Sequence, residues 1–383
     1  MNAQNELNGL TRRLERWLFE EALPLWWTTG ADHPRGGFHE EIDLQGRPTR
    51  AHRRARVQAR QTWVYATAGA LGWDGPWRAA MNHGLDYLLE RYPRPDGLFR
   101  ASVDAEGVPA DDAALLYDQA FVLFAMAAVF QAEPARGDLP ARARALLATA
   151  VSAFRHDDRG FKEASADHPF HANPHMHMLE AALAWSEIVA DPVWPALADR
   201  VADLALSAFI DRESGALREY FGPDWKPAPG PDGRIVEPGH QFEWAWLLLR
   251  WGVARGRPDA VAATSRLFEV GSRFGLDRGR GVAINAIGDD FTALNRSARL
   301  WPQTEWIKVA VVLAGAASDQ AERNRLRLEA VAAVKGLMLY LETPVRGAWR
   351  DKLNASGVFV EEPAPASSLY HIVCAIAALS KQP

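Results

Sequence analysis

The chain has 383 residues, and 43 lysine and arginine residues against 48 aspartate and glutamate residues give a formal net charge of −5. This mildly acidic balance lacks the basic surface that nucleic acids and anionic membranes bind, so we expect neither as a partner. Hydrophobic residues make up 48% and charged residues 24%, which is typical of a globular protein and excludes a disordered chain.

Cys374 is the single cysteine, which excludes an intramolecular disulfide and a zinc site built from cysteines. The N-terminal segment lacks the apolar core of a signal peptide, and no stretch reaches the roughly 18–20 apolar residues of a membrane span. We therefore expect a cytoplasmic protein.

Apolar spacing of the i, i+3, i+4 type dominates the sequence, and period-2 alternation occurs only in short pieces. This pattern predicts an all-α protein with helices near residues 10–29, 55–72, 76–92, 112–131, 138–154, 173–190, 194–209, 239–254, 257–274, 298–316, 322–341 and 366–380. The helices form six consecutive pairs. We interpret the Pro- and Gly-rich stretch 223–240 as a long loop over one end, and expect one domain over residues 1–383.

The second helix of each pair begins with a motif that carries a polar residue. The motifs are VQARQTWVYA, LLYDQAFVLFA, NPHMHMLEAALA, GHQFEWAWLLLRW, RLWPQTEWIKVAVVL and SSLYHIVCAIAAL, with Arg60, Asp118, His177, His240, Gln303 and His371 as landmarks. Successive landmarks are 58, 59, 63, 63 and 68 residues apart, which indicates a helical-hairpin repeat. Six hairpins bury their apolar faces by closing into a ring, so we predict an (α/α)6 barrel.

The loops between the pairs show a second repeat. GGFHEEIDLQG, GLFRASVDAEG and GAWRDKLNASG each end on Asp or Asn, two further residues and Gly. This spacing predicts short β-hairpins with a turn at the glycine, gathered in the loops at one end of the barrel.

His177, His240 and His371 occupy corresponding early positions of inner helices. In a closed ring the helix starts converge on one mouth, so we expect the three imidazoles to share a cavity. Glu243 follows His240 by one helical turn, where its carboxylate would orient the imidazole and stabilise its charged form. Three separate core histidines are the alternative interpretation.

The sequence gives no support for a metal or a cofactor. His175 and His177 would point to nearly opposite sides of a helix, and no His-Glu-x-x-His motif occurs, so we expect no metal site. Neither a Walker A loop nor a Rossmann glycine pattern is present. Arg60 opens an inner helix, where a guanidinium would bind hydroxyl groups or a developing oxyanion, unless it pairs with a carboxylate.

The six motifs together resemble those of the N-acylglucosamine 2-epimerase superfamily, on its mannose isomerase side, from about Gly36 to the C-terminus. The resemblance implies an (α/α)6 barrel that works without metal or redox cofactor. It also implies site residues. The acid/base group would be His240 with Glu243 as its partner carboxylate, His371 and His177, and the residues that contact the sugar would be Arg60, Tyr117, Asn173, Glu180, Trp301 and Gln303.

The activity that the resemblance implies is aldose–ketose isomerisation, with D-mannose and D-fructose interconverted through a cis-enediol. A histidine both takes and gives a proton near neutral pH, which suits this chemistry. A sugar 2-epimerase would use the same histidines and reprotonate C2 from the opposite face. We expect a monosaccharide as the partner and a monomer or homodimer as the assembly.

Two further function classes are weaker. A glycoside hydrolase on the same barrel would need two carboxylates across the scissile bond, for which Glu243, Glu305 and Asp118 are candidates, but it would give the histidines no role. A non-catalytic interaction protein would leave the whole acid/base set unexplained.

Overall fold

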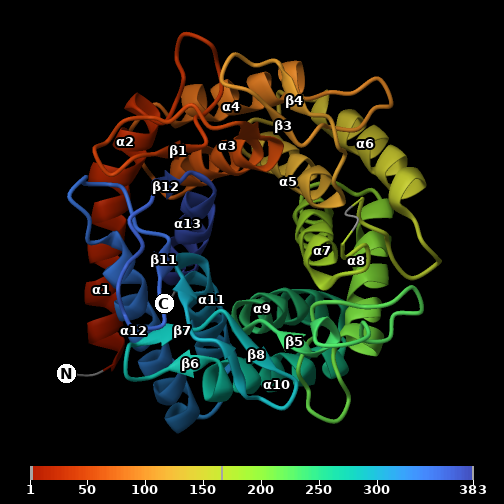
Figure 1. Ribbon diagram of the computed structural model, residues 1–383, viewed down its shortest axis with the longest axis vertical. Helices are drawn as coiled ribbons and strands as arrows, with labels where there is room; N and C mark the ends of the chain where they lie inside the picture. The colour runs from red at the N-terminus through yellow and green to blue at the C-terminus, as the bar shows by residue number, and fades with distance from the viewer. Residues whose placement is uncertain (1–2, 165–166, 382–383) are drawn as a thin grey trace.

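The structure is a computed structural model that describes residues 3–164 and 167–381. Its inner helices surround a central opening (Figure 1). They are α3 (Ala55–Ala70), α5 (Leu116–Ala132), α7 (Ala172–Ser186), α9 (Pro238–Arg255), α11 (Leu300–Ala316) and α13 (Ser367–Ser380). Each inner helix contacts the next one along the chain, and α13 contacts α3, so the ring is closed.

The outer helices form a second layer around this ring. They are α4 (Trp77–Arg91), α6 (Leu139–Phe154), α8 (Val193–Leu204, extended by a π-helical turn over Ala205–Phe209), α10 (Pro258–Phe274) and α12 (Gln320–Leu341). Each packs against the inner helix that precedes it in the chain. The predicted all-α barrel is therefore confirmed, but the predicted pairing was out of phase, because each inner helix from α3 to α11 packs mainly against the outer helix that follows it and not against the one before it. None of the described helices combines the length and the apolarity that crossing a membrane requires.

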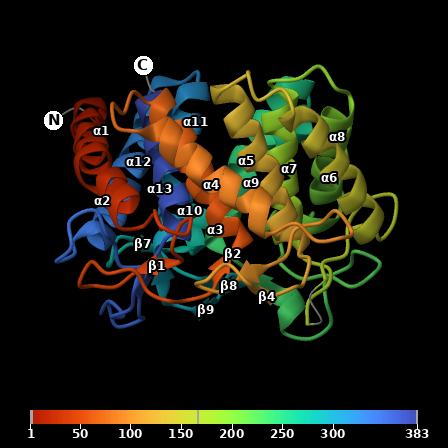
Figure 2. The ribbon, with the colours of Figure 1, turned by 90° about the horizontal axis from the view of Figure 1, so that it is seen from above.

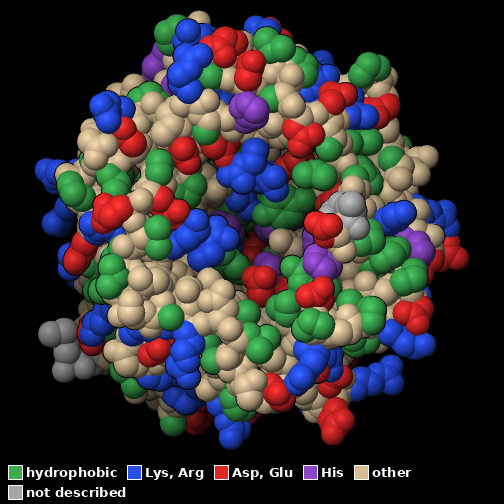
Figure 3. Space-filling model, in the orientation of Figure 1, with side chains coloured by type: hydrophobic (Ala, Val, Ile, Leu, Met, Phe, Trp, Pro, Cys, Tyr) green, Lys and Arg blue, Asp and Glu red, His purple; other side chains and the backbone are tan. Residues whose placement is uncertain are grey.

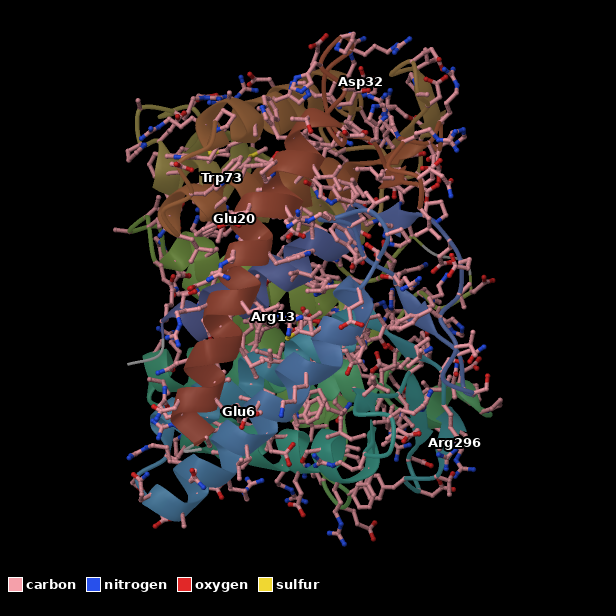
Figure 4. The ribbon with its side chains drawn as sticks, turned by 90° about the vertical axis from the view of Figure 1, so that its left-hand side faces the viewer. Glu6, Arg13, Glu20, Asp32, Trp73 and Arg296 are labelled. Atoms are coloured by element: carbon pink, nitrogen blue, oxygen red, sulfur yellow. The ribbon has the colours of Figure 1, made fainter. Side chains whose placement is uncertain are left out.

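The N-terminal segment completes the outer layer. It consists of α1 (Ala3–Trp17), a π-helical turn (Leu18–Ala22) and α2 (Leu23–Thr28). Figure 4 shows α1 lying along α12, with Glu6, Arg13 and Glu20 labelled along the segment, and an ion pair of 2.7 Å joins Glu6 to Lys335.

The predicted start of this first helix, near residue 10, was wrong. Leu7, Thr11 and Leu14 form a buried stripe at helical spacing, so α1 begins at Ala3. The polar residues around this stripe and Gly9 weaken the helix signal in the sequence.

Short antiparallel strands gather at one end of the barrel (Figure 2). They are β1 (Glu41–Ile42), β2 (Arg53–Arg54), β3 (Ser102–Val103), β4 (Pro109–Asp111), β5 (Ile235–Val236), β6 (Leu276–Asp277), β7 (Val282–Ala283), β8 (Ala286–Gly288), β9 (Ala293–Asn295), β10 (Ala298–Arg299), β11 (Lys352–Leu353) and β12 (Ala364–Pro365). The predicted loop 223–240 ends three residues earlier, because Pro238 begins α9; it contributes β5, which pairs with β8. Strand β1 pairs with β12, so the first and last loops of the barrel are joined.

The predicted turns at Asp/Asn-x-x-Gly are confirmed. Gly46, Gly107 and Gly357 have φ angles of +81°, +84° and +84°, a conformation that favours glycine. In each turn the glycine N–H donates to the carbonyl of the Asp or Asn three residues earlier, at 2.9–3.1 Å. Strands β3 and β4 flank the turn at Gly107 as a hairpin of two strands, whereas single antiparallel bridges close the turns at Gly46 and Gly357, Ile42 with Pro48 and Leu353 with Phe359.

A recurring side-chain contact, which we call the glutamine clamp, ties the loops to the inner helices. In four inner helices a buried glutamine near the helix start accepts the N–H and donates to the C=O of one residue of the preceding loop. The pairs are Gln58 with Phe38, Gln119 with Phe99, Gln241 with Leu217 and Gln303 with Ala283, at 2.7–3.0 Å. In α7, His175 accepts the N–H of Phe161 at 3.0 Å.

We predict that Gln119→Leu destabilises the protein by about 2–5 kcal/mol. The leucine would leave the N–H and C=O of Phe99 without partners in the core, and each buried unsatisfied group costs roughly 1–3 kcal/mol. Equilibrium unfolding in urea measures the change.

Gln131→Leu is the matched control, because Gln131 lies on the same helix but is exposed. Its effect should stay within about 0.5 kcal/mol. Equal stability of the two variants would contradict the structural role of the clamp.

Candidate active site

The starts of the inner helices surround a cavity of about 210 Å³. On the face that Figure 3 shows, basic, acidic and histidine side chains gather around a central hollow. The cavity is lined by Arg60, Tyr117, Asn173, His177, Glu237, His240, Glu243, Arg299, Trp301, Ser367, Ser368 and His371. All three histidines that the sequence singles out therefore reach one cavity, as predicted. Its volume corresponds to roughly seven water molecules of about 30 Å³ each, a size on the scale of one sugar ring.

His240 lies in the first turn of α9, next to two carboxylates. Its Nδ1 is 2.8 Å from Oε2 of Glu219 and 3.6 Å from Oε2 of Glu237. Burial alone would lower the pKa of His240, but the negative charges of the two glutamates outweigh burial and raise the pKa to about 10. His240 is therefore an imidazolium at neutral pH.

The predicted partner of His240 was wrong in detail. Glu243 was expected to hold the imidazole, whereas the hydrogen bond goes to Glu219, which lies in the loop before α9. The N–H of Nδ1 faces back toward that loop, and Glu243 lies one turn further along the helix.

Glu219 was not predicted, although the sequence carries a signal for it. Buried acidic residues follow an apolar loop residue by two positions in four repeats, as Phe38/Glu40, Phe161/Glu163, Leu217/Glu219 and Trp349/Asp351. In two of these repeats a glutamine clamp holds the apolar residue, Phe38 or Leu217, and in a third His175 accepts the N–H of Phe161.

His371 has a different environment in the first turn of α13. Its Nδ1 is 2.9 Å from Oε1 of Glu305, and the other oxygen of that carboxylate lies 2.6 Å from the ammonium of Lys308. Burial lowers the pKa of His371 well below its usual value, and the positive charges of Arg60 and Lys308 lower it further. His371 is therefore a neutral imidazole at neutral pH, and its Nε2 is free of this carboxylate.

His177 is held from behind by Glu180. Its Nδ1 is 3.1 Å from Oε2 of Glu180, whose other oxygen accepts a hydrogen bond from the hydroxyl of Tyr370. Burial lowers the pKa of His177 to about 4, so this imidazole is also neutral. Glu180 was predicted to contact the sugar, but it does not line the cavity and supports His177 instead.

Glu243 lines the cavity between the histidines. A carboxylate oxygen of Glu243 lies within 4.8 Å of a carboxylate oxygen of Glu305 and a ring nitrogen of His371. The same distance limit holds between Glu243 and the corresponding atoms of Glu180 and His177. Burial raises the pKa of Glu243 well above its usual value, and the charge of Glu305 raises it further. Its Oε1 has no hydrogen-bond partner among the described residues, so the carboxyl group offers an unused polar atom to a ligand.

Arg60 reaches the cavity from α3. It donates to the hydroxyl of Tyr117 at 2.8 Å, and its guanidinium carbon lies 4.2 Å from the ring centre of Phe121 and 5.2 Å from that of Tyr370. Within the described chain no ion pair joins Arg60 to a carboxylate. A buried guanidinium that aromatic rings hold without a carboxylate favours a ligand rich in oxygen.

Trp301 lies between His240 and His371. Its ring centre is 5.0 Å from that of His240 and 5.8 Å from that of His371. A Cβ atom at Gly239 would lie 2.5 Å from the indole, so glycine is required at this position for the ring to approach α9.

The remaining predicted residues divide into two groups. Asn173 lines the cavity as expected, but Gln303 does not, because its amide group forms the clamp with Ala283. Of the candidate hydrolase carboxylates, Asp118 is buried beside Arg56 and Glu305 beside Lys308, both outside the cavity wall. Glu243 alone of these three reaches the cavity.

Within the described residues, three groups have the donor set that a metal ion would need. They are His177 with Glu180 and Glu243, Glu219 with Glu237 and His240, and Glu243 with Glu305 and His371. In each group a histidine nitrogen already bonds a carboxylate or an ammonium ion lies beside one, which competes with a cation. Metal independence stays a prediction.

Known proteins resemble this chain in sequence and in fold. The family model described as N-acylglucosamine 2-epimerase matches residues 36–375. The "Mannose-6-phosphate isomerase" of Rhizobium meliloti is 48% identical over 367 residues, 95% of each chain. The "D-mannose isomerase" of Thermobifida fusca is 30% identical, and the match covers 88% of this chain and 86% of the relative. The structure of cellobiose 2-epimerase from Bacillus thermoamylovorans superposes with a TM-score of 0.87 at 17% identity, over 98% of this chain and 100% of that one, which shows the shared fold.

We predict that Glu219→Gln lowers the pKa of His240 from about 10 toward the ordinary histidine value, because the variant loses the nearest negative charge. Titration of the imidazole signals by NMR measures this shift. Glu213→Gln, at an exposed position of the same loop, is the control and should leave the titration unchanged. An unaltered pKa in Glu219→Gln would show that Glu237 alone holds the charge.

Proposed function

The chain belongs to the N-acylglucosamine 2-epimerase family, and we propose that it is an aldose–ketose isomerase that interconverts D-mannose and D-fructose. The observation that carries the proposal is the pair His240 and His371, which reach one cavity in opposite protonation states. A pair of titratable groups whose surroundings push their pKa values apart supplies an acid and a base at the same pH. Both are needed to isomerise a sugar.

In the proposed mechanism His240 is the acid that opens the ring. Its imidazolium donates a proton to the ring oxygen as the bond from C1 to that oxygen breaks, and it regains a proton from the C1 hydroxyl group. Glu219 and Glu237 hold the imidazolium in place and stabilise its charge.

His371 is the base of the second stage. Its Nδ1 is bonded to Glu305, so Nε2 takes the proton from C2 and returns it to C1 on the same face of the cis-enediol. Meanwhile His240 gives a proton to the oxygen on C1 and takes the proton of the C2 hydroxyl group. The guanidinium of Arg60 stabilises the negative charge on the enediolate oxygen.

Several finer points belong to the same proposal. Residues 1–383 form one catalytic domain, which acts in the cytoplasm on a monosaccharide, without metal or cofactor, as a monomer or homodimer. The size of the cavity and the single cysteine support these points. Mannose 6-phosphate is a second candidate substrate, because Arg299 lines the cavity and the relative from Rhizobium meliloti bears that sugar in its name.

A sugar 2-epimerase is the second candidate function. His240 and His371 come from different inner helices, α9 and α13, and a sugar held between them would meet an acid/base group on each face. The enediolate is common to both reactions, and the face that receives the proton at C2 decides the product.

The test is a panel of D-mannose, mannose 6-phosphate, D-glucose, N-acetylglucosamine and cellobiose, followed by NMR in heavy water. We expect D-fructose from D-mannose, with solvent deuterium at C1 in the fraction of turnovers in which the proton on Nε2 of His371 exchanges with water before it is returned. Glucose formed from mannose without fructose would favour the epimerase, and turnover of none of these sugars would contradict both. Activity that EDTA abolishes and Mn²⁺ or Zn²⁺ restores would contradict the metal-free mechanism.

His371→Ala should lower kcat in this assay by roughly 10²–10⁴-fold, the usual contribution of a general acid or base. His52→Ala is the matched control, because His52 is exposed and does not line the cavity. Full activity of both variants would mean that the imidazole of His371 is structural.

We predict that kcat/KM against pH forms a broad plateau. Activity needs neutral His371, so it is lost only as the pH falls below the ordinary histidine value of about 6.5. Activity also needs charged His240, so it is lost as the pH rises through about 10. Initial rates between about pH 5 and about pH 10.5 measure both limbs. Glu219→Gln should move only the alkaline limb to lower pH, and an acid limb above pH 6.5 would contradict the assignment of His371 as the base.

A further inference from the structure

Lys308 is unusual in this sequence. The chain carries 37 arginines and only six lysines, at positions 162, 226, 308, 335, 352 and 381. All six lie in the described part of the chain, and Lys308 alone is buried, with 1% of its surface exposed. A buried ammonium group loses its hydration, which destabilises the protein unless a partner offsets the loss, so a lysine here needs a reason.

The partner of Lys308 is the carboxylate that holds His371. Glu305 and Lys308 lie one turn apart on α11, with 2.6 Å between Nζ and Oε2. The other oxygen, Oε1, is 2.9 Å from Nδ1 of His371. The ammonium also lies 4.4 Å from the ring centre of Trp246. Lysine, glutamate and histidine thus form a continuous chain that ends at the cavity.

We propose that Lys308 is a positioning residue of the isomerase: it keeps Glu305 ionised, so that Glu305 accepts the Nδ1 proton of His371 and leaves Nε2 as the proton acceptor in the cavity. The inference rests on the proposed function for the role of His371 as the base. Lys308 does not line the cavity, so its effect on the reaction passes through Glu305.

The negative charges around Glu305 make a cation necessary. Burial raises the pKa of Glu305, and the nearby charge of Glu180 raises it further, while the ammonium of Lys308 opposes both. Without Lys308 the carboxyl group would take up a proton and become a donor. It would then donate to Nδ1 of His371, and the imidazole would have to carry its proton on Nε2. That tautomer cannot accept a proton from C2.

Other groups around His371 do not replace this cation. The titratable groups that surround the imidazole from the neighbouring elements are Arg60 on α3, His177 and Glu180 on α7, Glu243 on α9, Glu305 and Lys308 on α11, and Tyr370 and Cys374 on α13. Arg60 is the second cation of this set, but its guanidinium lies among aromatic rings and bonds the hydroxyl of Tyr117. The ammonium of Lys308 is the one in contact with Glu305.

The experiment replaces Lys308 with methionine, which has a similar length and no charge. We expect Lys308→Met to lower kcat by about 10–10³-fold and to change KM by less than about threefold, since the general-base term is at most about 10⁴-fold. Lys335→Met is the matched control, because Lys335 also forms an ion pair of 2.7 Å but lies on the surface. It should leave kcat unchanged.

A second readout does not depend on activity. Nitrogen-15 NMR of the labelled protein reports which ring nitrogen of His371 carries the proton, and the His371→Gln spectrum identifies the signals. We expect Nδ1–H in the unaltered protein and Nε2–H in Lys308→Met. An unaltered tautomer together with unaltered kcat in folded Lys308→Met would overturn the proposal. If the unaltered protein isomerises no sugar, the proposed function fails, and the tautomer still tests the contact.

The double variant covers the case in which Lys308→Met does not fold. Lys308→Met/Glu305→Gln removes both buried charges together, so no unpaired charge is left in the core. If Lys308 acts through Glu305, the double variant and Glu305→Gln should have the same kcat within about threefold, because the two effects are not additive. A further loss of tenfold or more in the double variant would mean that Lys308 acts independently, which contradicts the proposal.

Discussion

The geometry of the cavity depends on hydrogen bonds between a buried side chain near the start of an inner helix and the backbone of one residue in the preceding loop. Gln241 holds both backbone groups of Leu217, and this contact places Glu219, two residues further on, beside His240. In α7 the side chain of His175 holds Phe161, and Glu163 then accepts the N–H groups of Leu116 and Tyr117 at the start of α5. The clamps fix the loops to the helix starts, and the loops thereby place the carboxylates of Glu163 and Glu219, whereas Glu180 and Glu305 lie on the inner helices themselves.

His240 and His371 differ in protonation because their partner carboxylates have different neighbours. His240 faces Glu219 and Glu237, and among the described residues no lysine or arginine forms an ion pair with either glutamate, so the imidazole itself supplies the positive charge. His371 faces Glu305, whose charge Lys308 already balances. The same residue type near the starts of two inner helices is therefore charged in one place and neutral in the other, which is the basis of the acid and base roles proposed for them. The charged side chains around each histidine decide which state it adopts.

The sequence predicts the ring and most of the cavity, because both follow from periodicity. Helical spacing locates the inner helices, and the early position of His177, His240 and His371 brings them together. Glu219 is not predicted, because its partner lies 21 residues away across a loop whose path depends on tertiary contacts. The family resemblance implied that Gln303 contacts the sugar, but Gln303 forms a clamp instead. In the structure its equivalents are the clamp residues Gln58, Gln119 and Gln241.

Alignment of the repeats on the clamp shows that most cavity residues occupy two positions of the repeat, although His240, one residue before Gln241, lies outside them. The residues two before and two after the clamp are four apart in sequence, so they share one face of the helix, which is the face toward the cavity. These pairs are Arg56 and Arg60, Tyr117 and Phe121, Asn173 and His177, Gly239 and Glu243, and Trp301 and Glu305. In α13, Ser367 and His371 have the same spacing, and both line the cavity.

Gly239 shows that these positions are coupled between neighbouring helices. It is the single residue of this set without a side chain, and the indole of Trp301 from the next helix fills the space that its Cβ would occupy. The indole thereby reaches both His240 and His371 and forms one wall between the acid and the base. A larger residue at position 239 would displace that wall without touching either histidine. The distance between His240 and His371 is thus set by packing as well as by hydrogen bonding.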